Sequence, residues 1–207
     1  MEVGARDRIL HELKTKGSRT AAELAERLGV TPVAVRQHLA LLDSEGAVTF
    51  TAEPDGVGRP ARRWRLTDES RARFPDSHGE LAVGLIDAMR KSFGDKGLER
   101  LVRERTRAQA AAYEERIPSP RTPLPDRVAA LARIREEEGY MAEWSREADG
   151  SLLLVENHCP ICAAAEACQG LCAGELELFR EVLKARVERT EHLLEGARRC
   201  VYRITTE

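Results

Sequence analysis

The feature that most constrains this chain is a pair of short predicted helices, each with its own start signal, separated by a tight turn. Thr20 stands before the first helix, and Glu23 follows at the spacing of a capping box. A Gly-Val pair at 29–30 supplies the turn. Thr31 followed by Pro32 then starts the second helix, since proline is well tolerated at the first helical position. The two helices therefore cannot merge into one.

Apolar residues recur at helical spacing through this pair and through a helix that precedes it. The predicted inward-facing residues are Ile9, Leu10, Leu13, Leu24, Leu28, Val35, Leu39 and Leu42. Two predicted strands follow at 47–51 and 63–66, joined by a turn-rich stretch at 53–58. Three helices and a strand hairpin make the plan of a winged helix-turn-helix domain, which we place at residues 1–73.

The second helix of such a pair lies in the major groove of DNA, with its first residues near the base edges. Because Val35 and Leu39 point inward, Arg36 and Gln37 are expected to be exposed. Arginine can read guanine and glutamine can read adenine through paired hydrogen bonds. The predicted DNA-binding residues of this helix are Thr31, Pro32, Ala34, Arg36 and Gln37.

The hairpin supplies positive charge. The formal net charge of the chain is -2, so nucleic-acid binding must rest on a local basic patch. Residues 56–66 hold four arginines and no acidic residue. We predict that Arg59, Arg62 and Arg63 bind DNA through phosphates, and that Arg59 can also enter a minor groove. The alternative is a protein-interaction module with a solvated arginine face. We interpret Trp64 as a core anchor for the hairpin, with a stacking platform as the alternative.

The stretch TAAELAERLGVTPVAVRQHLALLDSEGAV, residues 20–48, resembles winged-helix regulators of the arsenic-repressor and multiple-antibiotic-resistance type. This resemblance implies a homodimer on a palindromic double-stranded DNA operator. It does not imply an arsenic site, because the first 158 residues contain no cysteine.

Residues 74–117 are predicted to be helical and charged, with an apolar stripe of Leu81, Leu85, Ile86 and Met89. Such helices have too little apolar surface to fold alone, and packing against a second copy would bury it. We therefore interpret them as a dimerisation segment, with packing against the last segment of the same chain as the alternative. Four prolines in residues 118–125 make a linker.

Residues 126–207 are predicted to form an α+β domain. Helices are expected at 126–137 and 175–184, and strands at 140–145, 152–156, 187–192 and 200–204. The expected fold class of the whole chain is α+β, mainly α, with the winged helix first, the dimerisation helices next and this domain last.

All five cysteines lie in this last domain, and an odd number argues against a disulfide framework. Cys159 and Cys162 form a Cys-x-x-Cys pair, Cys168 and Cys172 are one turn apart if a single helix holds both, and Cys200 is distant. Thiolates bind soft metals and iron–sulfur clusters. Core cysteines, a redox dithiol and a structural zinc site are the alternatives.

The same domain resembles the SufR-type iron–sulfur repressors through HCP at 158–160, LCAGELELF at 171–179, VERTEHLLEG at 187–196 and CVYRI at 200–204. The resemblance implies that Cys159, Cys172 and Cys200 bind an iron–sulfur cluster, with four-iron four-sulfur favoured and zinc as the alternative. It also implies control of iron–sulfur assembly genes. Cys162 is our first choice as the fourth ligand and Cys168 the second, while His158 and His192 are minor candidates.

An enzyme is not expected, because the sequence has no Ser/His/Asp order, phosphate loop or His-Glu-x-x-His motif. No apolar run approaches the roughly 18 residues of a membrane span, and the start of the chain has no signal-peptide core, so a cytoplasmic protein is expected. The sequence predicts a DNA-binding regulator, expected to be a repressor, that responds to an iron–sulfur cluster. A winged-helix regulator with a zinc or thiol redox site is the alternative, followed by a cysteine-dependent enzyme.

Overall fold

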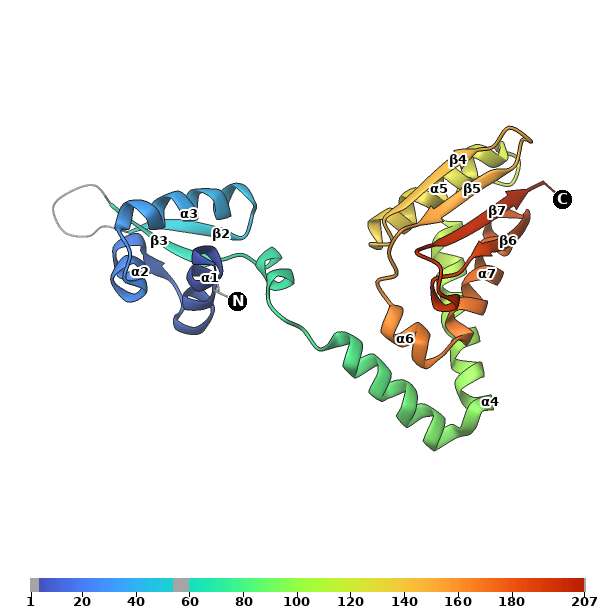
Figure 1. Ribbon diagram of the computed structural model, residues 1–207, viewed down its shortest axis with the longest axis horizontal. Coiled ribbons are helices and arrows are strands. Elements are labelled where there is room, and N and C mark those ends of the chain that lie inside the picture. Colours follow the sequence, from blue (N-terminus) through green and yellow to red (C-terminus); the bar gives the residue numbers. More distant parts are fainter. Residues whose placement is uncertain (1–3, 54–59, 207) are drawn as a thin grey trace. The chain divides into compact units, whose positions relative to one another are not determined.

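The computed structural model describes residues 4–53 and 60–206 and divides the chain into two compact units, Met1–Asp76 and Ser77–Glu207 (Figure 1). Each unit is described by itself below. The predicted turn around residue 58, with Arg59, lies outside the described residues. None of the described helices combines the length and the apolar character that a membrane span requires.

In the described residues 4–53 and 60–76, the first unit has three α-helices and a small antiparallel sheet. The helices are α1 (Ala5–Lys16), α2 (Ala21–Leu28) and α3 (Pro32–Ser44), and the 3-10 helix η1 (Glu69–Arg73) follows the sheet. The strands are β1 (Arg19–Thr20), β2 (Val48–Glu53) and β3 (Ala61–Leu66), in the spatial order β1-β3-β2. This is the predicted winged helix-turn-helix arrangement.

Local hydrogen bonds start the helices where the sequence predicts. The Thr20 hydroxyl accepts a hydrogen bond from the Glu23 N–H at 3.2 Å, and the Glu23 carboxylate accepts one from the Thr20 N–H at 2.6 Å. Gly29 turns the chain with a left-handed φ of 68°. The Thr31 hydroxyl accepts from the Ala34 N–H at 3.2 Å, which caps α3. These caps satisfy backbone donors that a helix start leaves without partners.

The core of the first unit contains the predicted apolar residues together with Trp64 of β3, except that Leu28 is only partly buried at its edge. Val35, Leu39 and Leu42 of α3 are fully buried. Trp64 is 5% exposed, and its ring centroid lies 4.9 Å from that of Phe50 on the facing strand. The interpretation of Trp64 as a core anchor for the hairpin is therefore confirmed.

The second unit combines four helices with a four-stranded antiparallel sheet. The helices are α4 (His78–Glu114), α5 (Leu124–Glu137), α6 (Cys162–Ala167) and α7 (Gly170–Leu183), and the short 3-10 helix η2 spans Leu193–Glu195. The strands are β4 (Ala142–Arg146), β5 (Leu152–Glu156), β6 (Arg186–Glu191) and β7 (Cys200–Thr205), in the order β4-β5-β7-β6. The mixed, mainly helical fold class is confirmed.

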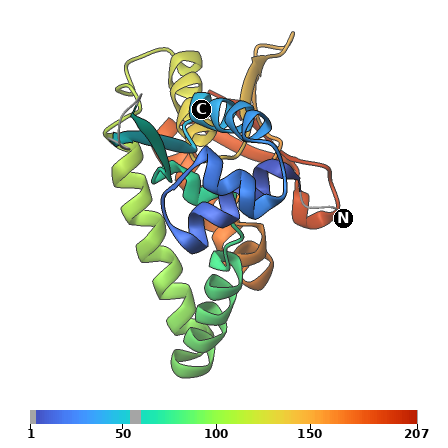
Figure 2. The ribbon, with the colours of Figure 1, turned by 90° about the vertical axis from the view of Figure 1, so that its left-hand side faces the viewer.

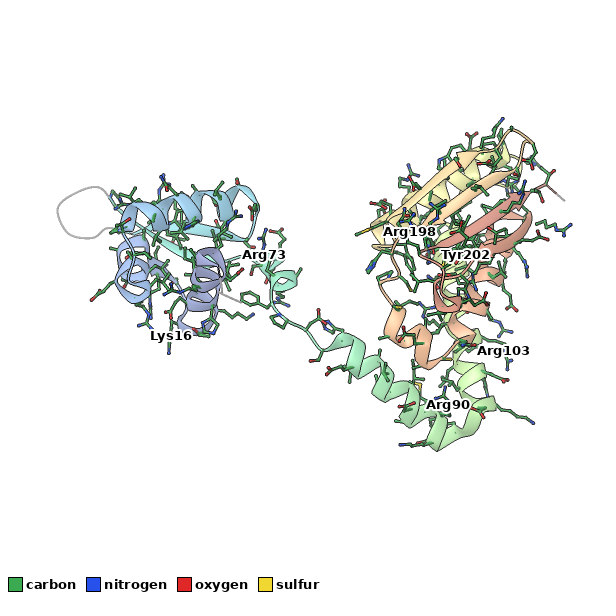
Figure 3. All side chains as sticks on the ribbon, in the orientation of Figure 1. Lys16, Arg73, Arg90, Arg103, Arg198 and Tyr202 are labelled. Atoms are coloured by element: carbon green, nitrogen blue, oxygen red, sulfur yellow. The ribbon has the colours of Figure 1, made fainter. Side chains whose placement is uncertain are left out.

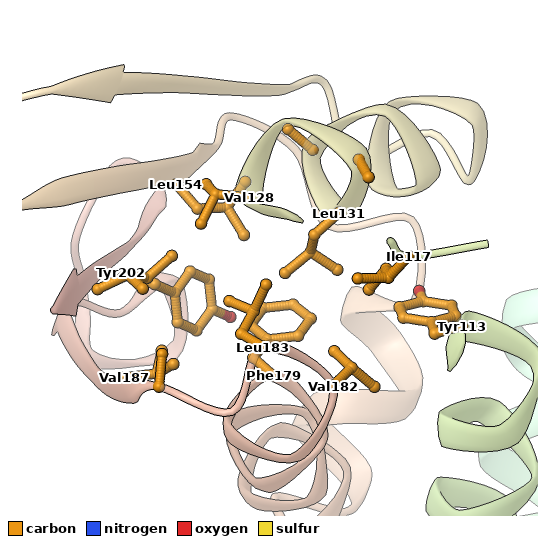
Figure 4. Close-up of a cluster of buried hydrophobic side chains, with 14 of the residues drawn as sticks. Tyr113, Ile117, Val128, Leu131, Leu154, Phe179, Val182, Leu183, Val187 and Tyr202 are labelled. Atoms are coloured by element: carbon orange, nitrogen blue, oxygen red, sulfur yellow. The ribbon is translucent and has the colours of Figure 1, made fainter. Parts of the chain in front are cut away.

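The main core of this unit lies where α5, α7 and the end of α4 meet the sheet. Figure 4 shows Val128 and Leu131 of α5 beside Leu154 and Tyr202 of the sheet, with Phe179 of α7 between the layers. Tyr113, near the end of α4, belongs to the same cluster and is 2% exposed.

Helix α4 bends sharply at Gly94, where φ is 68° and ψ is 177° (Figure 2). Its inner face packs against α6 and α7: the Arg90 guanidinium donates to the Ala167 carbonyl at 2.7 Å, and Thr106 approaches Gly174 so closely that a Cβ there would lie 2.5 Å from its hydroxyl. Residues 78–114 thus belong to the same unit as residues 124–206 instead of forming the separate segment predicted at 74–117. Leu81 and Leu85 of the predicted stripe remain exposed, at 61% and 49%.

We predict that Leu39→Ala lowers the free energy of unfolding of the first unit by about 2–5 kcal/mol, because it opens a cavity in a fully buried site. Leu41 on the same helix is 48% exposed, so Leu41→Ala is the matched control, with a change of about 0.5 kcal/mol or less. The chain has two tryptophans, so urea unfolding in a Trp144→Phe background follows Trp64 alone. Equal effects of the two alanines would contradict this core assignment.

Candidate DNA interface and cysteine site

The outer face of α3 presents the residues expected to read DNA. Arg36 and Gln37 are exposed, while their neighbours Val35 and Leu39 are fully buried. The buried pair fixes the rotation of the helix, so the arginine and glutamine side chains lie on the outer surface near its start. The exposure predicted for them is confirmed, whereas contact with bases stays a prediction.

The first turn of α3 has one exposed apolar residue that the sequence analysis missed. Val33 is 59% exposed, beside exposed Pro32 and half-buried Ala34. Apolar side chains at such a position can contact the methyl group of thymine. Val33 does not fit the helical spacing of the inward-facing residues of α3, and this was the signal that could have revealed it. The Thr31 hydroxyl, in contrast, is already engaged as the cap.

Arg62 and Arg63, the two predicted DNA-binding arginines of the wing that the structure describes, differ. Arg62 is exposed, and its guanidinium lies 4.2 Å from the centroid of the Phe50 ring. Arg63 is half-buried: it donates to the Ser18 carbonyl at 3.3 Å and lies 3.7 Å from the Glu23 carboxylate. Arg62 therefore faces solvent on the hairpin, while Arg63 ties β3 to the segment before α2.

In the second unit, three of the five cysteines line one small cavity. Cys159 follows β5, Cys172 lies in the first turn of α7, and Cys200 begins β7. In Figure 1, the end of β5 and the start of β7 lie together at one edge of the sheet, on the side towards α6. The other residues that line the cavity are Tyr140, Glu156, His158, Ala165, Glu175, His192, Leu193 and Leu194. The structure thus brings together the three cysteines, and the two histidines, that the sequence analysis singled out.

Cys162 and Cys168 have different surroundings. Cys162 starts α6, its N–H donates to the Cys159 carbonyl at 3.2 Å, and its thiol donates to the Glu166 carboxylate with an S···O distance of 3.6 Å. Cys168 is buried and lines a groove with Leu98 and Val102 of α4. A single helix through Cys168 and Cys172 is wrong, because α6 ends at Ala167 and α7 begins at Gly170.

The cysteine thiols are held in an environment that disfavours their charge. Burial raises the pKa of Cys159 to about 12, with further increases from Cys162, Glu175 and Cys172. Burial likewise raises the pKa of Cys172 to about 11, helped by Glu175, Cys200 and Cys162. The pKa of Cys200 is also raised, mainly by burial. Burial therefore favours the neutral thiols over the thiolates in this cavity.

Behind this cavity lies a cluster of buried charges that the sequence analysis did not find. Arg135 of α5 is 1% exposed and contacts Glu156 and Glu175, both of which line the cavity. Burial raises the pKa of Glu156 to about 7, against the lowering effect of Arg135. An arginine on the apolar face of a predicted helix was the available signal, since arginine is seldom fully buried unless it is paired.

Among the described residues, no group of three or more His, Cys, Asp or Glu side chains is close enough to hold a single metal ion. The three cavity cysteines are thus neighbours without forming a closed site for one ion. A metal centre there, and its ligand set, stay predictions.

Comparison with known proteins supports the fold of the first unit. A family model described as an HTH domain matches residues 6–58. Together with the three helices and the hairpin, this match defines a winged helix-turn-helix domain, a class of domain that DNA-binding transcriptional regulators use.

Two solved structures are similar over longer stretches. NMB1585, a MarR family regulator from Neisseria meningitidis, is 21% identical over 66% of this chain and 79% of its own, with a TM-score of 0.29. Bacillus subtilis PadR in complex with operator DNA is 15% identical over 85% of this chain and 98% of its own, with a TM-score of 0.31. These TM-scores are too low to establish a shared overall fold. No curated protein shows significant similarity to the chain.

We predict that mild oxidation of metal-free protein joins Cys159 to Cys162 and leaves Cys168 as a thiol. The Cys162 N–H donates to the Cys159 carbonyl at 3.2 Å, so these two residues share one turn, while Cys168 faces α4. Diamide treatment followed by peptide mapping measures the pairing. Cys168→Ser serves as the control and should give the same disulfide. A main product that contains Cys168 would contradict the described arrangement.

Proposed function

We propose that this protein is a DNA-binding transcriptional regulator, acting as a repressor, that reads its operator through α3. The observation that carries the proposal is the exposed Arg36–Gln37 pair on a helix whose other face is fixed by buried Val35 and Leu39. The HTH family match over residues 6–58 supports it. Arg62 on the exposed side of the hairpin supplies charge for phosphate contact.

The DNA-binding form is proposed to be a homodimer on a palindromic operator. Leu81, Leu85 and Phe93 are exposed on the first half of α4, at 61%, 49% and 67%. A second copy packed on this apolar face would bury it. Such a dimer requires half-sites about one helical turn apart, or a multiple of it.

The cysteine cavity is proposed to hold an iron–sulfur cluster that controls DNA affinity, in keeping with the likeness of this segment to iron–sulfur repressors. Cys159, Cys172 and Cys200 come from three separate elements and line one cavity, and Cys162 adjoins Cys159. In a four-iron four-sulfur cluster each cysteine binds a different iron, so the sulfurs need not converge on one point as they must for zinc. Because no described group of three His, Cys, Asp or Glu side chains is close enough for one ion, a cluster is favoured over a single zinc ion.

A thiol redox switch is a second candidate, and the Cys-x-x-Cys spacing of Cys159 and Cys162, whose backbones share a 3.2 Å hydrogen bond, favours it. In this case the disulfide, and not a metal centre, would change how the segment from β5 to α6 packs. Iron and sulfide analysis of protein purified without oxygen separates the two candidates.

We predict that Arg36→Ala weakens operator binding by roughly 1–3 kcal/mol and relaxes specificity at one base pair. Arg62→Ala is the matched control: it should weaken binding to all sequences alike and reduce the salt dependence. Fluorescence anisotropy with specific and unrelated duplexes at several salt concentrations measures both. If Arg36→Ala lowered specific and nonspecific affinity equally, Arg36 would not read a base.

We predict that serine at Cys159, Cys172 or Cys200 abolishes the cluster, because each supplies one ligand from a different element. Cys162→Ser should lower iron and sulfide content, since Cys162 is the first choice for the fourth ligand, while Cys168→Ser should leave it unchanged. Anaerobic iron and sulfide assays and the absorption spectrum give the readout. A full cluster in the Cys172→Ser or Cys200→Ser protein would overturn the ligand assignment.

We predict a dimer at micromolar concentration that Leu85→Glu converts to a monomer, because a buried carboxylate in an apolar contact is costly. Sedimentation velocity measures the change. Arg107→Glu, at an exposed site farther along α4, is the control and should remain dimeric. A wild-type monomer would rule out the proposed dimer.

A further inference from the structure

The most unusual side chain of the second unit is Arg135, an arginine on α5 that is 1% exposed. Its Nε donates to the Glu156 carboxylate at 2.6 Å, and one of its terminal nitrogens donates to the Glu175 carboxylate. The guanidinium carbon also lies 3.3 Å from the centroid of the Tyr140 ring. Glu156, Glu175 and Tyr140 all line the cysteine cavity, so Arg135 lies directly behind its wall.

Each of these three partners adjoins a different cavity cysteine. Glu156 is paired with Cys200 in the ladder between β5 and β7. Glu175 follows Cys172 by three residues on α7, which places both on one face of the helix. The Tyr140 carbonyl accepts a hydrogen bond at 3.0 Å from the N–H of His158, the residue before Cys159. One guanidinium thus touches the three segments that carry the three cysteines.

The same guanidinium also reaches α4. Its second terminal nitrogen donates to the Tyr113 hydroxyl at 3.3 Å and to the Glu138 carboxylate at 3.3 Å. The Tyr113 hydroxyl in turn donates to Glu138 at 2.5 Å and accepts from the Gln109 amide at 3.2 Å. Tyr113 is buried near the end of α4, so a side chain of this helix shares the hydrogen bonds of the cavity wall.

A buried guanidinium requires all of these partners at once. Arginine presents five N–H donors in a rigid plane, which suits it to contact several carboxylates in fixed directions. Removing one member of a buried ion pair leaves an uncompensated charge, so the segments cannot move independently without a large cost. Two further hydrogen bonds complete the network. The Tyr202 hydroxyl donates to Glu175 at 2.6 Å (Tyr202 is labelled in Figure 3), and Arg189 donates to the Cys172 carbonyl at 2.6 Å.

We propose that Arg135 is the positioning residue of the cysteine site, and that Tyr113 links this site to α4. The inference rests on the proposed cluster-responsive function and deepens it. Partners outside the ligand set that hold ligands in place are generally worth a large factor in metal affinity. A change in the cysteine segments would reach α4 through the shared guanidinium, which makes α4 responsive to the state of the cavity.

The first test compares Arg135→Gln and Arg135→Lys with Arg133→Gln, a control two residues away at an exposed position of the same helix. In anaerobic titrations with iron and sulfide, Arg135→Gln should bind the cluster about 10- to 100-fold more weakly. Arg135→Lys should fail to restore binding, because an ammonium cannot span the same carboxylates. Arg133→Gln should bind the cluster as tightly as the wild type does. If Arg135→Gln also bound it as tightly as the wild type, the proposal would be overturned.

A second readout needs no cluster. In metal-free protein, Arg135→Gln should speed alkylation of Cys159, Cys172 and Cys200 by iodoacetamide, followed peptide by peptide, and leave Cys168 unchanged. A wild-type protein that binds no iron would refute the proposed function, whereas unchanged alkylation in Arg135→Gln would refute the positioning role. The two failures are therefore distinguishable.

Tyr113→Phe tests the link to α4 and keeps the proposal falsifiable if Arg135→Gln fails to fold, since it removes one hydroxyl only. The cluster spectrum should be unchanged, while the ratio of operator affinities with and without the cluster should move towards one. Arg116→Gln is the control, because it breaks the exposed Arg116–Glu137 ion pair between the end of α4 and α5 without touching the cavity wall. A Tyr113→Phe ratio equal to that of the wild type would overturn the link.

Discussion

The arrangement of the second unit depends on one constraint: a guanidinium that is removed from water must keep its carboxylate partners. Arg135 meets this need with Glu156 from β5 and Glu175 from α7, which lie 21 and 40 residues away in the chain. Satisfying both fixes α5, the sheet and α7 relative to one another. The cysteine cavity is a consequence, because its walls are the segments that these carboxylates hold.

The first unit depends on local signals, and the sequence accordingly predicts it almost completely. The caps at Thr20 and Thr31 form within a few residues, and the apolar spacing around Leu39 identifies the buried face. The strands of the second unit are also predicted, from alternation at 140–145 and from an apolar run after an Asp-Gly turn at 152–156. The face of α4 that packs on α7 could not be predicted, because the close fit of Thr106 against Gly174 joins residues far apart in sequence.

The candidate cysteine site was likewise predicted only in part. A family resemblance singled out Cys159, Cys172 and Cys200, and the structure places all three around one cavity. The break between α6 and α7, which turns Cys168 towards α4, was open in the sequence because Gly170 permits either a continuous helix or a new one. The Arg135 network was missed because it depends on pairing between distant segments.

In the proposed mechanism, the state of the cysteine cavity sets the affinity of α3 for DNA. The most direct measurement is an anaerobic titration of labelled operator DNA with one preparation of protein, before and after its cluster is removed by a chelator and oxidant. If a cluster controls DNA binding, the starting protein contains iron and sulfide, and the two forms differ clearly in operator affinity, a difference that is restored when the cluster is rebuilt. Identical affinities in both forms would contradict it.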